Sequence, residues 1–217
     1  MKLVLTHAYP RAITLAAIAL TFGCNKKADN TANYTGAINT YYSAHPVCLW
    51  DSPRQLPTQA DSSGSGKTTD MNALVDQGLL TRTTSEKKVF IVASKQVNNY
   101  DLSDKGRSAW TADPQQPGYG NFCYGRRKVS SIDSASPTTS DPGATTQVDY
   151  RYTIDGIPDW AKAAETQTAY PNLQADLAGP QAAQATLTNT TNGWQLTSAP
   201  GAARHTLPTA ADGTIVK

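Results

Sequence analysis

The sequence contains few histidines and no motif that is typical of a catalytic or cofactor site. Its 217 residues include three histidines, His7, His45 and His205. A Ser-His-Asp triad or a multi-histidine metal site therefore has very little material. We predict no catalytic residue, no metal site and no cofactor, and the composition favours a non-enzymatic protein.

A large excess of one charge sign is also missing. The chain has 19 basic and 17 acidic residues, and loss of the first 23 residues would remove Lys2 and Arg11 and leave the two signs equal. A strongly basic field is what drives non-specific binding to nucleic acid. We therefore expect no nucleic-acid partner.

Long hydrophobic runs are lacking, but the amino end has the three parts of a secretory signal peptide. A segment with Lys2 and Arg11 precedes an apolar run over residues 12–22 and then Gly23. The eleven residues of the run would form a helix of about 16 Å, too short for a hydrocarbon core of about 30 Å. A short buried helix is the alternative, but the run has no polar face. We predict a signal peptide over residues 1–23.

The residues around Cys24 resemble the lipobox of bacterial lipoproteins, in which a leucine, a small residue and Gly or Ala precede the cysteine that becomes diacylated. Gly23 and Cys24 match this pattern, whereas Phe22 is bulky and Leu20 lies one position too early. The resemblance implies cleavage before Cys24 and a lipid on its sulfur. In that family Asn25 would favour the outer membrane. We expect an exported, lipid-anchored protein of the cell envelope that faces the periplasm.

If Cys24 carries lipid, Cys48 and Cys123 remain. Two cysteines in an oxidising compartment are expected to pair, and both are flanked by aromatic residues that suit a packed disulfide. The bond would close a loop of about 75 residues and contribute on the order of 2–4 kcal/mol. The alternative is two buried free thiols in a cytosolic protein.

The chain predicts one globular α+β domain with an antiparallel sheet and a few short helices. Residues 24–33 are polar and small, as in a tether, and residues 199–217 are typical of a disordered tail. The domain would span 34–198, either as one unit or as a first part over 34–117 and a β-rich part over 118–198.

Local patterns place several elements within this domain. Alternating apolar and polar residues predict a strand over 147–154, with 127–132 as its antiparallel partner. The apolar, β-branched segment 88–93 predicts another strand. A helix is expected over 157–170, and Asn192-Gly193 predicts a hairpin turn.

One segment of about 35 residues resembles the helix, strand and wing of winged-helix domains. It begins with ALVDQGLL at 73–80 and ends with YDLSDKGR at 100–107, with a hairpin-like interval between them. The resemblance implies a winged-helix-like first half. Behind an export signal such a fold would serve as an interaction or packing module. A cytosolic winged-helix DNA-binding protein is the alternative.

A compact group of basic and aromatic residues is the candidate contact patch. It consists of Tyr119, Tyr124, Arg126, Arg127 and Lys128. Such a patch could bind phosphate, anionic lipid or an acidic polymer. The alternative interpretation is the beginning of a strand whose charges face water.

Carboxylates are the remaining route to catalysis, with Asp149, Asp155, Asp159 and Glu165 as candidates. Their ordinary interpretation is surface charge and stabilisation of helix starts. An envelope hydrolase is therefore a third hypothesis. The leading one is a lipid-anchored cell-envelope protein that acts as a non-enzymatic binding or structural module. Its partners would be the membrane, through Cys24, and an unknown envelope protein or polymer.

Overall fold

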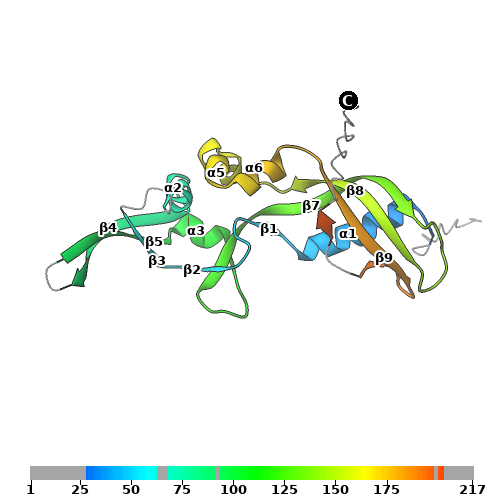
Figure 1. The fold of residues 1–217 in the computed structure, drawn as a ribbon, viewed down its shortest axis with the longest axis horizontal. Helices are drawn as coiled ribbons and strands as arrows, with labels where there is room; N and C mark the ends of the chain where they lie inside the picture. Colours follow the sequence, from blue (N-terminus) through cyan, green and yellow to red (C-terminus); the bar gives the residue numbers. More distant parts are fainter. Residues whose placement is uncertain (1–27, 63–67, 91–92, 198–199, 203–217) are drawn as a thin grey trace, which may run out of the picture.

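The computed structural model describes residues 28–62, 68–90, 93–197 and 200–202. These residues form an elongated α+β molecule, which confirms the predicted fold class (Figure 1). An eight-stranded antiparallel sheet occupies one end and a three-stranded antiparallel sheet the other. Short helices pack between and against the two sheets.

The larger sheet is built around one long strand. Its main path has the order β1-β7-β8-β9-β10, with the bounds β1 Val47–Cys48, β7 Tyr119–Ser136, β8 Thr145–Asp155, β9 Gln181–Thr190 and β10 Gly193–Leu196. Two short strands also pair with β7 and one with β9, namely β2 Arg54–Gln55, β6 Trp110–Ala112 and β11 Gly201–Ala202. The predicted strands at 147–154 and 127–132 lie within β8 and β7 and pair antiparallel, as expected. The predicted hairpin joins β9 and β10, but its turn is Thr191-Asn192, because Gly193 already pairs with Thr190.

Helix α1, Thr31–Ala44, packs against this sheet and buries one stripe of side chains. Tyr34, Ile38 and Tyr42 are each four residues apart, so they lie on one face of the helix. The hydroxyl of Tyr42 lies 2.5 Å from the hydroxyl of buried Tyr150 on β8. These side chains belong to the second of two hydrophobic cores. The first core is built around Trp50, Leu74, Phe122 and Trp160.

The smaller sheet has the order β3-β5-β4 and carries a long hairpin that projects from the molecule (Figure 1). Its elements are β3 Thr58–Asp61, β4 Leu80–Phe90 and β5 Ala93–Leu102, with the helices α2 Thr69–Asp76 and α3 Asp104–Ala109. The predicted strand at 88–93 is divided between two antiparallel strands, since residues 88–90 end β4 and Ala93, which pairs with Phe90, begins β5; residues 91–92 lie outside the described residues. Polar residues on both sides of the tip form the strands, since ladder hydrogen bonds do not require apolar side chains.

Three short helices replace the single helix that we predicted over 157–170. They are α4 Asp159–Lys162, α5 Ala164–Ala169 and α6 Pro171–Leu177. Ala163 adopts extended backbone, with φ −65° and ψ 136°, and breaks the run. The break lets Trp160, Tyr170 and Leu173 all reach the first core.

The two cores are not divided at residue 117, where the sequence placed a boundary between two parts. Helix α1 from the first half packs in the second core, and α4–α6 from the second half pack in the first. Strand β7 contributes to both, with Phe122 in the first core and Val129 in the second. Each core therefore contains residues from both halves of the sequence, and the chain passes from one core to the other more than once.

Both ends of the fold differ from the predicted boundaries. Helix α1 begins at Thr31, and the indole N–H of Trp194 donates to the carbonyl of Ala28 at 3.2 Å. Residues 28–33 are therefore part of the fold and not of a tether. At the other end, β11 extends the fold to Ala202, into the predicted tail. The predicted signal peptide and Cys24 lie outside the described residues.

Among the helices that the structure describes, none is long and apolar enough to cross a membrane.

Candidate binding groove

The end of β1 and the two residues after it are fixed to β7, at Cys48, Leu49 and Trp50. Cys48 faces Cys123 across the two strands, and their sulfurs lie within disulfide-bonding distance, as the cysteine count led us to expect. The N–H of Leu49 donates to the carbonyl of Phe122 at 3.0 Å. These contacts make the segment a fixed wall.

Buried Asn121 completes this attachment by holding the backbone of Trp50 on both sides. Its amide nitrogen donates to the Trp50 carbonyl at 2.6 Å, and its amide oxygen accepts from the Trp50 N–H at 3.2 Å. The asparagine is 8% exposed, so water competes little for these bonds. The position of Trp50 is therefore set by β7.

The opposite wall comes from the end of α5 and the start of α6. Tyr170 is buried there, and its hydroxyl donates to the carbonyl of Asp70 at 3.1 Å. Burial, followed by the charge of Asp70, raises the pKa of the Tyr170 hydroxyl well above its usual range. The phenol therefore stays protonated and remains a hydrogen-bond donor. Pro171 follows at the first position of α6, where no backbone N–H is needed.

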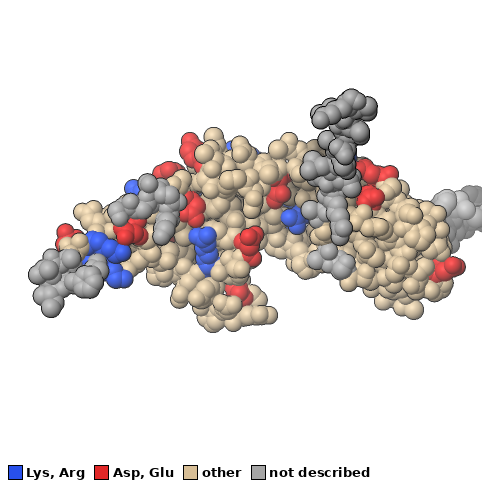
Figure 2. Space-filling model, in the orientation of Figure 1, with Lys and Arg blue, Asp and Glu red and all other residues tan. Residues whose placement is uncertain are grey.

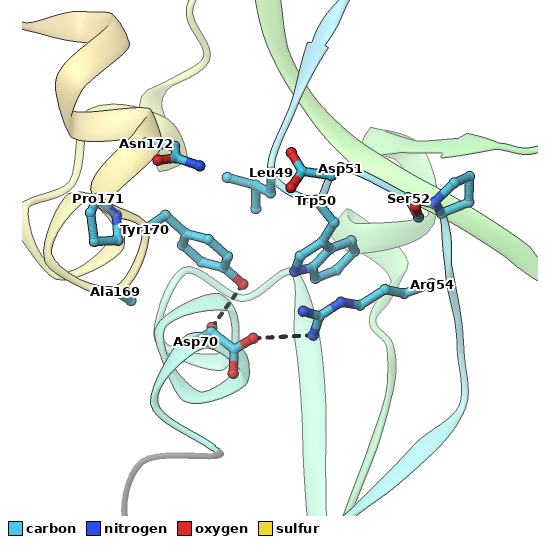
Figure 3. A pocket seen from close by; sticks show the side chains of 11 residues that line it. Leu49, Trp50, Asp51, Ser52, Arg54, Asp70, Ala169, Tyr170, Pro171 and Asn172 are labelled. Atoms are coloured by element: carbon cyan, nitrogen blue, oxygen red, sulfur yellow. Dashed lines mark hydrogen bonds and ion pairs between the residues drawn. The ribbon is translucent and has the colours of Figure 1, made fainter.

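A cavity of about 520 Å³ lies between these walls (Figure 3). Across its floor the Arg54 guanidinium pairs with Asp70 at 3.2 Å and lies 4.8 Å from the centre of the Trp50 ring. The indole nitrogen of Trp50 is buried and has no well-aligned acceptor among the described residues. Its N–H lies near the Tyr170 hydroxyl and lowers the pKa of Tyr170, but burial and the charge of Asp70 raise that pKa by more. The floor is thus aromatic, and its two charges neutralise each other.

A second cavity of about 250 Å³ adjoins the first. The two cavities share three lining residues, Leu49, Asp51 and Asn172. We call the two cavities together the groove. In the second cavity the Tyr124 hydroxyl donates to Asp176 at 2.6 Å, and burial followed by this carboxylate raises the pKa of Tyr124.

Arg127 is the basic side chain of the second cavity. Its guanidinium carbon lies 5.7 Å from the centre of the Tyr42 ring and 5.3 Å from that of Tyr152, within the range of cation–π contacts. Tyr42 belongs to α1 and Tyr152 to β8, so Arg127 lies where the two cores meet. Its Nε atom is buried with no hydrogen-bond partner among the residues that the structure describes.

The candidate contact patch does not form one surface. Tyr124 and Arg127 come together in the second cavity. Arg126 instead donates to the Ser43 carbonyl at 3.0 Å, exposed Lys128 lies 3.5 Å from Asp155, and Tyr119 pairs with Gln55 at the far end of β7.

Regular strand alternation would place Tyr124 and Arg127 on opposite faces of β7. A bulge brings them together, because Val47 pairs with Gly125 and the next residue, Cys48, pairs with Cys123. Gly125 has φ +151°, a conformation that glycine adopts most readily. No pattern in the sequence located this bulge.

Several groove residues were missed from the sequence because they come from separate segments. They are Asp51, Arg54, Asp70, Tyr170, Asn172 and Asp176. The only signal was the aromatic flank of Cys48, which we interpreted as packing for the disulfide. The groove is a product of tertiary structure, and no local spacing encodes it.

None of the carboxylates proposed for hydrolysis lines the groove. Asp149 accepts from Ser134 and Gln184, both at 2.7 Å. Asp155 lies near Lys128, and Asp159 pairs with Lys162 at 3.2 Å. Each of these three is engaged in a local polar contact. Within the described ranges, no group of three or more His, Cys, Asp or Glu residues is placed to hold a metal ion.

Comparison of the chain with models of known protein families, with curated proteins and with solved structures gave no match. Function is therefore inferred from the groove and from the amino-terminal sequence.

Proposed function

We propose that this chain is a lipid-anchored protein of the cell envelope that acts by non-enzymatic binding, and that the groove is its binding site. Export and lipid anchoring are supported by the signal-like residues 1–23 and by Gly23-Cys24. The pairing of Cys48 with Cys123 suits an oxidising compartment.

The observation that carries the binding function is a fixed wall combined with polar groups at the mouth of the groove that have no partner among the described residues. Binding sites are usually preformed cavities of about 300–1,000 Å³ with a few polar groups among apolar ones. The groove has this character, because Trp50 and Tyr170 form its floor while Asp51 and Asn172 are exposed above them (Figure 3). A wall held at three consecutive residues loses little freedom when a ligand binds.

The anchor is tested by labelling cells with a palmitate analogue. Wild-type protein should carry the label and sediment with membranes, and Cys24→Ala should do neither. An Asn25→Ala variant is the matched control and should keep the label. Equal labelling of the wild type and Cys24→Ala would refute the anchor.

The second candidate is a cytosolic DNA-binding protein with a winged-helix-like part. The projecting β4–β5 hairpin favours it, because Lys87 and Lys88 are exposed there and basic side chains gather at this end of the molecule (Figure 2). A phosphatase reporter that is active only after export, fused after residue 60, decides between the two. Activity supports the envelope protein, and an inactive but expressed fusion supports the DNA-binding protein.

A further inference from the structure

Asp51 and Asn172 occupy the junction of the two cavities. Both side chains are exposed, and neither has a hydrogen bond to another described residue. Figure 3 shows them on either side of Leu49, above the floor made by Trp50 and Tyr170. A carboxylate and an amide therefore present hydrogen-bonding groups across an apolar strip.

The charges of the groove argue against an anionic ligand. Three aspartates and two arginines line it. Arg54 is already paired with Asp70, and the guanidinium of Arg127 lies against two tyrosine rings. Asp51 is exposed and has no hydrogen-bond or ion-pair partner among the described residues, so its carboxylate accepts hydrogen bonds and repels anions.

The wall also argues against an extended peptide that would join as an additional strand. Strand addition requires free backbone N–H and C=O groups on the receiving edge. The N–H groups of Leu49 and Trp50 and the carbonyl of Trp50 are already bonded to β7. Recognition in this groove must therefore rely on side chains.

We infer that the groove binds a neutral saccharide chain, an inference that rests on the proposed binding function. Hydroxyl groups of the sugar donate to the Asp51 carboxylate and exchange hydrogen bonds with the Asn172 amide. The C–H faces of the sugar rings lie against Leu49 and exposed Pro171, because Trp50 and Tyr170 beneath them are each only 7% exposed. Because the two cavities meet at the Asp51–Asn172 pair, one sugar unit lies on each side of it.

The test is calorimetric titration of the full chain, purified from membranes in detergent. The probes are a linear tetrasaccharide of N-acetylglucosamine and maltotetraose, which are both neutral but differ in their acetamido groups. Wild-type protein is expected to bind at least one of them saturably. Asp51→Asn and Asn172→Ala should each weaken that binding at least five-fold. Glu86→Gln, the same type of substitution at an exposed position of the hairpin, should leave it unchanged.

The inference is overturned if neither tetrasaccharide saturates the wild-type protein, or if both groove variants bind as the wild type does. Binding of tetra-alanine in place of the saccharides would assign the groove to peptides and would also overturn it. Lipid labelling and membrane sedimentation are measured on the same preparation. The saccharide inference can thus fail while the lipid anchor stands, and the reverse.

Discussion

Removal of the link between Cys48 and Cys123 should destabilise the whole molecule and not only the groove. The two residues are 75 positions apart, and the entropy of closing a loop of that length corresponds to about 4.5 kcal/mol at 25 °C. Measured effects are generally smaller, so we expect the double variant Cys48→Ser/Cys123→Ser to lose about 3 kcal/mol. For a protein of this size, that loss lowers Tm by roughly 6–12 °C.

Thermal unfolding followed by circular dichroism measures this shift. Reductant should lower the Tm of the wild type to that of the double variant and should leave the double variant unchanged. Intact mass after alkylation, before and after reduction, reports whether the two thiols are free. A double variant that melts within about 2 °C of the wild type, together with two alkylatable thiols in unreduced protein, would refute the bond and the estimate.

Three further predictions concern a backbone clamp, two helix glycines and a buried tyrosine. Asn121→Ala leaves the backbone of Trp50 without its two partners and should cost roughly 1–3 kcal/mol in urea unfolding; an unchanged midpoint would contradict this. Gly106→Ala would push a methyl group against a backbone carbonyl and should destabilise by roughly 1–3 kcal/mol. Gly36→Ala meets nothing within 4 Å on exposed α1 and should stabilise by about 0.5–1 kcal/mol, so equal melting temperatures for the two glycine variants would count against the packing. Burial and the hydrogen bond with Tyr42 raise the pKa of the Tyr150 hydroxyl, so the folded state holds the hydroxyl proton more tightly than the unfolded state does. The stability from this group is complete below about pH 10 and is lost as the pH rises further. Melting temperatures measured between pH 8 and 11 should fall less steeply in Tyr150→Phe, and identical slopes would contradict the assignment.

The predictable part of this fold is the part encoded by local periodicity. The alternation in 147–154 predicted β8 because one face of that strand is buried and the other faces water. Asn192-Gly193 predicted a hairpin, and one is present, with Thr191 and Asn192 as its two-residue turn and Gly193, at φ 102°, directly after it. In both cases the determining physics lies within a few residues.

Elements whose structure depends on distant partners could not be predicted in this way. Polar residues 81–88 form most of β4 because β5 pairs with them, although their composition gives no strand pattern. Residues 157–170 have the apolar stripe of a single helix, but the core accepts Trp160 and Tyr170 together only when Ala163 interrupts the helix. Tertiary packing overrides the local preference in both cases.

The position of the groove follows from the crossing of the chain between the two cores. Arg127 contacts Tyr42 from the second core and lines a cavity whose other side is Leu173, a residue of the first. Trp50 at the other cavity is held through Asn121 on the same strand. Both cavities therefore depend on the position of one element, β7, which contributes side chains to both cores. A change that loosens the attachment of residues 48–50 to β7 should consequently disturb both cavities, whereas a change at the projecting hairpin should disturb neither.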